Sequence, residues 1–298
     1  MKCFSMFSGI GGFDLALQNL GHEMIGACEI DRYARQIYAK QFPRVKIWED
    51  ATKINPTELP EFELLCAGFP CQAFSMAGKR LGFEDTRGTL FYEIARIARE
   101  KKPSYLFLEN VKGLLNHDNG RTFATIISTF YDLGYDVEWQ VFNSKYFVPQ
   151  NRERIFIIGH FREKPTRQIF PIRENDTIND KSYNKEQAER KWVWRKISGA
   201  ICSNYKKGEG TGTMIYHNQP NMVNRIQERI NTCALTSTFS LLENEKIRML
   251  TPLECERLQG FPDNWTDGIS DTQRYKCIGN AVTVPVIEYI AKYFEDIK

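Results

Sequence analysis

The sequence predicts an α/β fold in which helices pack around a largely parallel β-sheet. Over the first 160 residues, short apolar runs of strand length alternate with segments of helical pattern, which is typical of consecutive βαβ units. Most of the helical segments stop at a glycine or a proline, residues that commonly end a helix. The chain has 298 residues, of which 42% are hydrophobic and 26% charged, so it can bury a substantial core and is not globally disordered.

The expected elements follow in chain order. The strands are Lys2–Phe7, Glu23–Cys28, Leu64–Ala67, Tyr105–Leu108, Tyr135–Phe142 and Arg154–His160, with a further short apolar run at Val45–Trp48. The helices are Phe13–Leu20, Arg32–Phe42, Thr89–Lys101 and Arg121–Leu133. Gly21, Pro43 and Gly134 stop three of these helices. Near the C-terminus, Thr251 predicts the N-cap of another helix, with Pro252 in its first turn and Glu254 as the partner in a capping box.

Composition narrows the class of protein. No run approaches 18 apolar residues and the chain opens directly into a strand-like segment, so we expect neither a membrane span nor a signal peptide. The eight cysteines are scattered, without a Cys-x2-Cys pair, and the four histidines lie far apart. This pattern predicts reduced thiols in a cytosolic protein and no zinc or other metal site, with one thiol available as a nucleophile. The cysteines are Cys3, Cys28, Cys66, Cys71, Cys202, Cys233, Cys255 and Cys277.

The positive charge is concentrated in one segment. The whole chain carries a net charge of +3, whereas residues 162–247 contain fifteen Lys or Arg and ten Asp or Glu, a net charge of +5. Within this segment, basic residues interleave with Trp192, Trp194 and Tyr205. Such a stripe suits a nucleic-acid backbone, although a solvated surface on an ordinary insertion would have the same composition.

The first strands end in residues that suit a nucleoside. Phe4–Gly12 reads as a strand, a glycine turn that a ligand can approach closely, and then a helix. Acidic residues at 29–31, after the second strand, can accept hydrogen bonds from ribose hydroxyls, and Asp50 can bond an adenine amine. Asp31 and Asp50 could equally be helix caps. Because the carboxyl ends of parallel strands share one edge, the set predicts an adenosine pocket there.

A candidate nucleophile follows the next strand. The segment GFPCQAFS at 68–75 places Cys71 on a loop at the same edge of the sheet, where open α/β folds bind ligands. Gly68 and Pro70 favour a rigid, exposed turn, whereas Cys66 fits a buried structural role. Glu109 brings a carboxylate to this edge at the end of the following strand.

Together these motifs resemble those of the DNA (cytosine-5) methyltransferases, especially the small bacterial restriction–modification enzymes of the HhaI type. The resemblance covers residues 4–161 and 248–286. The matching segments are FSMFSGIGG, EID at 29–31, DAT at 50–52, GFPCQAFS, DTRGTLF at 85–91, LENV at 108–111, PQNRER at 149–154, RMLTPLECERLQGFP at 248–262 and YKCIGNAVTVPV at 275–286. It does not extend through 162–247, where the family is variable and reads its DNA target.

The resemblance implies methylation at C5 of a cytosine flipped out of the duplex, through a covalent adduct between the enzyme and C6. It assigns the nucleophile to Cys71, which must ionise to attack. Glu109 would hold the N3 and N4 edge of the base, a role that requires a partly desolvated carboxyl group. Arg154 would donate to O2, and Arg152 would orient the catalytic loop or offset the thiolate charge.

The implied cofactor is S-adenosylmethionine. Glu29 would bind the ribose, and Asp50 and Ala51 would meet the adenine. Ile30 stands where the family often has an aromatic residue, which predicts weaker stacking. The full set of residues carried over by position is Phe7, Gly9, Gly11, Gly12, Glu29, Ile30, Asp50, Ala51, Pro70, Leu90, Asn280 and Val282.

The resemblance also refines the architecture. It implies the Rossmann-like mixed sheet of S-adenosylmethionine-dependent methyltransferases, with helices on both faces, and a small, mostly irregular or β target-recognition domain. We expect the catalytic domain at 1–161 and 272–298 and the small domain at 162–271, with its variable part at 162–247. Base-reading candidates, chosen because their side chains can make bidentate contacts, are Gln219, Asn221, Arg225, Gln227 and Arg229.

The expected partner is double-stranded DNA, read by a cytoplasmic monomer of bacterial or phage origin that is functionally paired with a restriction endonuclease. Two alternatives stay open from the sequence. A related subfamily methylates transfer RNA by the same chemistry, although the long basic segment favours duplex DNA. A DNA-binding relative without catalysis is disfavoured because Cys71, Glu109, Arg152 and Arg154 are all present.

Overall fold

The computed structural model describes residues 1–69, 90–172, 213–214, 239–243 and 246–294. The chain divides into two compact units: unit 1 comprises Met1–Phe142, Glu153–Pro171 and Ile287–Lys298, and unit 2 comprises Asn143–Arg152 and Ile172–Val286. The domain boundaries expected from the sequence stay a prediction. Within the described ranges, no helix is long and apolar enough to cross a membrane.

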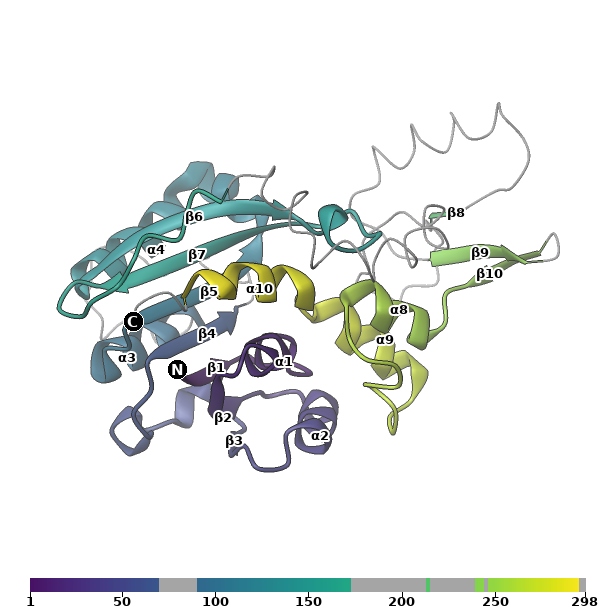
Figure 1. The fold of residues 1–298 in the computed structure, drawn as a ribbon, viewed down its shortest axis with the longest axis horizontal. Coiled ribbons are helices and arrows are strands. Elements are labelled where there is room, and N and C mark those ends of the chain that lie inside the picture. Colours follow the sequence, from purple (N-terminus) through teal and green to yellow (C-terminus); the bar gives the residue numbers. More distant parts are fainter. Residues whose placement is uncertain (70–89, 173–212, 215–238, 244–245, 295–298) are drawn as a thin grey trace. The chain divides into compact units, whose positions relative to one another are not determined.

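Unit 1 is built on a seven-stranded sheet with the order β3-β2-β1-β4-β5-β7-β6 (Figure 1). Strands β1 to β5 are parallel and β7 runs antiparallel to β5, so the sheet is mixed. The strands are β1 (Lys2–Met6), β2 (Glu23–Cys28), β3 (Ile47–Trp48), β4 (Leu64–Gly68), β5 (Tyr105–Val111), β6 (Tyr135–Asn143) and β7 (Glu153–Phe161). Each coincides with an expected strand or apolar run, and β5 continues three residues beyond its expected end.

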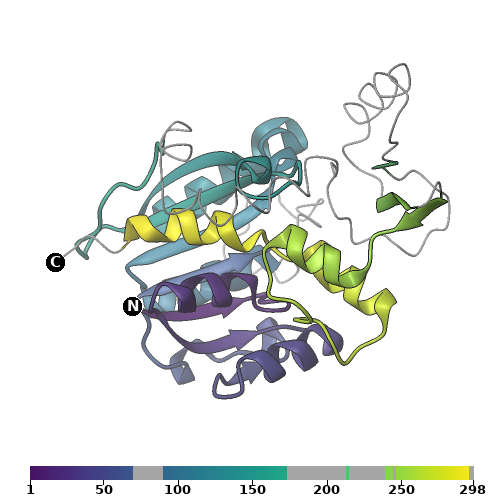
Figure 2. The ribbon, with the colours of Figure 1, turned by 45° about the vertical axis from the view of Figure 1, so that its right-hand side comes forward.

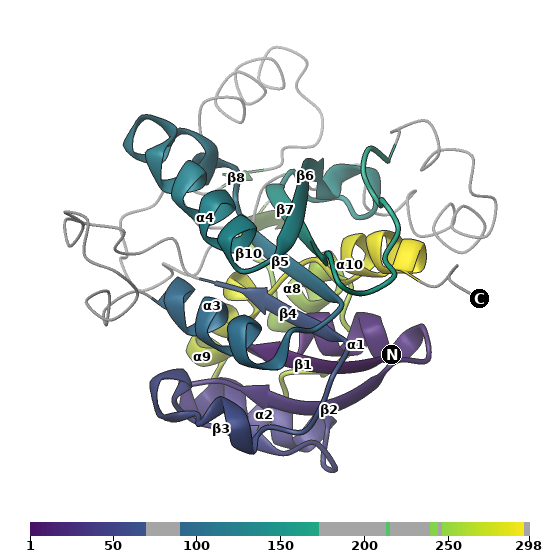
Figure 3. The same cartoon turned by 90° about the vertical axis from the view of Figure 1, so that its left-hand side faces the viewer.

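Helices cover both faces of this sheet, which confirms the expected fold class (Figure 3). Alternate residues of β5 point to opposite faces. Leu106 and Leu108 belong to the core that includes Phe91 and Phe130, whereas Phe107 contacts Phe13 on the other side. The helices are α1 (Gly12–Asn19), α2 (Arg32–Gln41), α3 (Leu90–Lys101), α4 (Arg121–Asp132) and α10 (Val284–Ala291).

The face opposite α3 and α4 carries α1 and the end of the chain. The part of α10 that belongs to unit 1 runs along the same side of the sheet as α1 (Figure 2). Just after α10, the ring of Phe294 lies 5.4 Å from that of Phe107 and 4.9 Å from that of Tyr105. This packing ties the C-terminal segment to the centre of the unit 1 sheet.

Unit 2 contains a three-stranded sheet and a pair of helices. Strand β9 (Phe239–Glu243) pairs in parallel with β8 (Thr213–Met214) and antiparallel with β10 (Lys246–Met249). Helix α8 (Pro252–Gln259) begins at the expected capping box of Thr251 and Glu254 and ends at Gly260. Helix α9 (Asp271–Asn280) follows. The packing of α8 needs a glycine at 260, where φ is +81° and a Cβ would lie 2.3 Å from Cδ of Pro285.

Candidate active site

The carboxyl ends of β4 and β5 bring Gly68, three residues before Cys71 in the sequence, next to a carboxylate. In the register of these strands, Gly68 at the end of β4 pairs with Glu109. Glu109 and Asn110 lie inside β5 because the strand continues its antiparallel pairing with β7 as far as Val111 and Arg154. The sequence places the strand end earlier because its polar residues resemble a strand terminus. The expectation that Glu109 reaches this edge of the sheet is confirmed.

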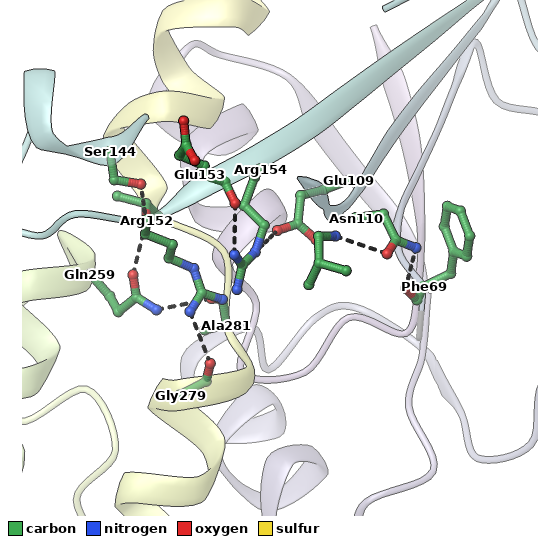
Figure 4. A network of polar contacts seen from close by, with 12 residues as sticks. Phe69, Glu109, Asn110, Ser144, Arg152, Glu153, Arg154, Gln259, Gly279 and Ala281 are labelled. Carbon is green, nitrogen blue, oxygen red and sulfur yellow. Dashed lines mark hydrogen bonds and ion pairs between the residues drawn. The ribbon is translucent and has the colours of Figure 1, made fainter. Parts of the chain in front are cut away.

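Glu109 forms an ion pair with Arg154 from the neighbouring strand (Figure 4). Arg154 pairs with Val111 across the ladder, so its side chain is the diagonal neighbour of Glu109 on the same face. The distance from Nε of Arg154 to Oε1 of Glu109 is 3.0 Å, and Glu109 is only 8% exposed. The carboxyl group is therefore partly desolvated, as the role proposed for it requires.

Asn110 fixes the start of the loop that carries Cys71. Its side-chain Nδ2 donates to the backbone carbonyl of Phe69 at 2.9 Å, and its Oδ1 accepts from the backbone N–H of Val111 at 2.8 Å. Asn110 is buried, and Phe69 immediately precedes Pro70. The described chain thus ends two residues before Cys71, at a position tied to β5. Pro70 and Cys71 themselves lie outside the described residues, as do the candidates at 219–229.

At the other end of the same sheet edge, the glycine turn is joined to Glu29. The backbone N–H of Gly9 donates to Oε2 of Glu29 at 2.8 Å, and that of Asp31 donates to Oε1 at 2.8 Å. Burial raises the pKa of the Glu29 carboxyl group. Both Gly9 (φ +56°) and Gly11 (φ +84°) have left-handed backbone, and a Cβ on Gly11 would lie 2.3 Å from the ring of Phe42. The backbone of this turn therefore requires glycine at position 11.

The next two loops add an exposed apolar side chain and an acid. Ile30 is 69% exposed beside Glu29. Asp31 caps α2 by accepting from the N–H groups of Tyr33 and Ala34, and Asp50 caps a short 3-10 helix by accepting from the N–H of Thr52. The capping interpretation of both acids is therefore confirmed. Ala51 is buried and Leu90 is half exposed at the start of α3.

Arg152 belongs to unit 2, although it lies only two residues from Arg154. Its guanidinium donates to the backbone carbonyls of Gly279 (Nη1, 3.3 Å) and Ala281 (Nη2, 3.0 Å), on either side of Asn280 (Figure 4). It is 5% exposed. Asn280 is exposed and Val282 is buried.

Known proteins place this chain in a family. The family model for C-5 cytosine-specific DNA methylases matches residues 1–296. The chain belongs to the C-5 cytosine-specific DNA methylase family. It is thus a DNA (cytosine-5) methyltransferase.

Curated relatives cover almost the whole methylase chain. Type II methyltransferase M.HpaII of Haemophilus parainfluenzae is 42% identical over 313 residues, which span 96% of this chain and 87% of the relative. Type II methyltransferase M.HhaI of Haemophilus parahaemolyticus is 38% identical over 308 residues, which span 98% of this chain and 93% of the relative. Type II methyltransferase M1.ScrFI of Lactococcus lactis subsp. cremoris is 39% identical, with 98% and 77% covered.

Solved structures share the methylase fold. The crystal structure of a Spodoptera frugiperda DNMT2 mutant superposes with a TM-score of 0.66 at 18% identity, covering 98% of this chain and 99% of that one. A putative DNA modification methyltransferase encoded within an Escherichia coli prophage gives a TM-score of 0.65 at 21% identity, with 98% of both chains covered.

The remaining thiols of the methylase that the structure describes are buried. Burial raises the pKa of Cys3, Cys28 and Cys255 to about 12, and it also raises the pKa of Cys66 well above its ordinary value. Thiols with such a pKa are not ionised at neutral pH, which rules them out as nucleophiles. Cys66 has the buried role that the sequence predicts. In the described ranges, no group of three or more His, Cys, Asp or Glu could hold a metal ion.

Sequence reasoning missed the polar residues around Arg152. Gln259 is fully buried and donates through Nε2 to the carbonyls of Ile278 and Ala281, both at 3.0 Å. Thr283 donates to Oε1 of Gln259 at 2.9 Å and accepts from Ser144 at 2.9 Å. Two signals could have found them: Gln259 and Thr283 lie in segments that match the family, and Thr283 is a polar residue between Val282 and Val284.

Proposed function

We propose that this methyltransferase transfers a methyl group from S-adenosylmethionine to C5 of a flipped-out cytosine in a specific sequence of double-stranded DNA, with Cys71 as the nucleophile. The observation that carries the proposal is the Glu109–Arg154 pair. It lies on β5 and β7, next to the strand that leads directly to Cys71. A carboxylate and a guanidinium held together in this way match the N3 and O2 edges of one cytosine.

The chemistry assigns a separate task to each of these groups. C5 of cytosine is a poor nucleophile until a thiolate adds at C6 and turns C5 into an enamine carbon. Cys71 supplies that thiolate, Glu109 stabilises the proton at N3 as the adduct forms, and Arg154 donates to O2. After methylation, a base removes the C5 proton and the Cys71–C6 bond breaks. Asn110 supports the attack by Cys71, because its hydrogen bond to the Phe69 carbonyl fixes the chain two residues before the nucleophile.

The glycine turn and its neighbours fit a nucleoside cofactor. Among the described residues, apart from the chain neighbours of Gly9, no heavy atom lies within 4 Å of the position that a Cβ would take on Gly9, whose N–H donates to the Glu29 carboxylate. Glu29 offers acceptors suited to ribose hydroxyls, and Ile30 offers an exposed apolar surface suited to a base. When bound, S-adenosylmethionine supplies an electrophilic methyl group. The other proposed pocket residues of unit 1 are Phe7, Gly11, Gly12, Asp50, Ala51, Pro70 and Leu90.

Target recognition is proposed for the basic segment 162–247, within a small domain at 162–271. The support is its net charge of +5 and its position between the two stretches that carry the family's motifs. We also propose that the enzyme acts as a cytoplasmic monomer and as the modification half of a restriction–modification system. The names of the bacterial relatives, all Type II methyltransferases, support this pairing.

Covalent trapping tests the proposal. Duplex DNA that carries 5-fluorocytosine at the target site should form a stable complex with the wild-type enzyme and S-adenosylmethionine, because the fluorine cannot leave as a proton does. Cys71→Ala should form no complex and transfer no methyl group. Cys66→Ala, which removes a buried thiol five residues away, is the matched control and should still be trapped.

The same assay separates the alternatives. Trapping or normal methylation by Cys71→Ala would contradict the proposal. Methylation of transfer RNA in place of duplex DNA would assign the substrate to the RNA-modifying relatives. Salt-dependent DNA binding without transfer of labelled methyl groups would identify a non-catalytic protein. Bisulfite sequencing of plasmid DNA from expressing cells would give the target sequence.

A further inference from the structure

Unit 2 contains a buried polar network around one turn of backbone. Its members come from three separate stretches of chain: the 143–152 segment, the end of α8, and the residues after α9 (Figure 4). They converge on the backbone at 278–281. The buried side chains are Ser144, Gln150, Arg152, Gln259 and Thr283.

This turn needs outside partners. The last carbonyls of an α-helix have no intrahelical donor, and α9 ends at Asn280. Arg152 and Gln259 supply side-chain donors. Arg152 donates to the carbonyls of Gly279 and Ala281, and Gln259 donates to those of Ile278 and Ala281. The positive charge of Arg152 at a helix C-terminus also complements the helix dipole. The backbone is therefore fixed on both sides of Asn280.

Gln259 is itself held in a single orientation. Its Oε1 accepts from the hydroxyl of Thr283 at 2.9 Å and from Nε2 of Gln150 at 3.3 Å. Because Oε1 is used by these donors, Nε2 must face the carbonyls of the turn. Ser144 completes the chain of bonds by donating to Thr283. Hydrogen bonds that link several buried side chains to one stretch of backbone favour a single backbone conformation there.

We propose that Arg152 and Gln259 are positioning residues, which act on the cofactor through the turn that carries Asn280 and Val282. This inference rests on the proposed function, because it takes from the family resemblance that Asn280 and Val282 contact S-adenosylmethionine. The hydrogen bonds from Nη1 and Nη2 of Arg152 to Gly279 and Ala281 go to backbone carbonyls, so they fix the backbone of this turn. Arg152 thereby differs from Arg154, which presents its guanidinium to Glu109.

Binding of S-adenosylmethionine, measured by equilibrium dialysis without DNA, tests this directly. Arg152→Met and Gln259→Met should each raise the Kd by about 10-fold, because each removes hydrogen bonds that fix the turn. For Gln259→Met at saturating cofactor, kcat should stay within about threefold of wild type, because Gln259 is not one of the groups proposed to contact the reacting base. In the double variant, the Kd should rise by less than the product of the two single increases, because both side chains donate to the carbonyl of Ala281.

Matched variants keep the test independent of folding. Thr266→Val removes a different buried hydroxyl of unit 2, one that donates to Glu256, and should leave the Kd unchanged. Thr283→Val and Arg152→Lys are milder changes within the network, and they should raise the Kd in the same direction even if Arg152→Met does not fold.

Three results would overturn the inference. These are an unchanged Kd in all the network variants, a Kd raised equally by Thr266→Val, or, for Gln259→Met, a kcat loss of about 100-fold or more at saturating cofactor with an unchanged Kd. Failure of the proposed function would appear instead in the wild-type protein, which would not bind S-adenosylmethionine at all.

Discussion

Two arginines of one motif have different environments. Arg154 lies at the start of β7, partly exposed, with its guanidinium on the carboxylate of Glu109. Arg152 lies two residues earlier, outside the strand and almost fully buried, with its guanidinium on backbone carbonyls. On a continuous strand, residues two apart would point to the same face. Because β7 begins at Glu153, this rule does not apply to Arg152. The side chain of Arg154 therefore contacts Glu109, whereas that of Arg152 contacts the backbone at 279–281.

The largest expected effect concerns Glu109, the partner of Arg154. Glu109→Gln should lower kcat for methyl transfer by about 10⁴-fold, because an amide cannot stabilise the N3 proton as a carboxyl group does. Single-turnover transfer of labelled methyl groups to duplex DNA measures this. Glu153→Gln is the control: it breaks an exposed ion pair between the first residue of β7 and Lys112, which follows β5, and should change kcat less than twofold, or about 0.4 kcal/mol. Equal losses in both variants would contradict the role of Glu109.

Arg154→Met should lower kcat by about 10³-fold, which corresponds to the loss of one preorganised donor to the reacting base. The Kd of S-adenosylmethionine should not change, in contrast to that of the Arg152 variants. Arg154→Lys, which keeps the charge but not the forked geometry, should recover part of the rate. If Arg154→Met instead weakens cofactor binding and spares kcat, the distinction between the two arginines is lost.

A buried acid of unit 1 should make the stability of the protein depend on pH. In unit 1, the fully buried Asp14 accepts from Tyr38 at 2.5 Å and from Ser5 at 3.0 Å, and burial raises its pKa from 3.8 to about 6. Asp14 binds its proton more tightly in the folded state than in the unfolded state. Its contribution to the free energy of unfolding is therefore complete below about pH 4 and is lost as the pH rises through about 6.

The size of that loss follows from the shift. Between about pH 4 and pH 7, the free energy of unfolding of the wild type should fall relative to that of Asp14→Asn by about 3 kcal/mol. Urea unfolding of both proteins across this range measures the difference. Tyr38→Phe keeps the carboxyl group and should retain the pH dependence. A difference that does not vary with pH would show that Asp14 is not the responsible group.

The smallest effect concerns the helix that carries Gln259. Thr251→Ala removes the N-cap of α8 and should lower the free energy of unfolding by about 1 kcal/mol. The Kd of S-adenosylmethionine should remain within about twofold, because Gln259 lies at the opposite end of the helix. Glu254→Gln preserves the capping box and should cost less. A loss of cofactor affinity as large as that of Gln259→Met would show that general stability, not the turn, controls binding.

Local patterns in the sequence determined most of the fold. Alternating strand and helix signals, with Gly and Pro stops, predicted each strand of the unit 1 sheet and helices α1 to α4, because these signals depend on residues close together in the chain. The capping box at Thr251 was predictable for the same reason. The end of β5 was not, since Glu109 and Asn110 are kept in the strand by pairing with β7, which is about 45 residues away in the sequence.

The motifs also indicated which residues belong to the candidate site, including Glu109, Arg154 and Glu29. Their individual surroundings were decided only in the tertiary structure. The sequence places Arg152 and Arg154 in one motif without showing what either guanidinium contacts, and it places Gln259 in a matching segment without giving it a role. A hydrogen-bonding partner more than a hundred residues away, such as the carbonyl of Ala281, leaves no trace in local pattern. Side-chain type is encoded locally, but the direction in which a guanidinium donates depends on which backbone the fold brings to it.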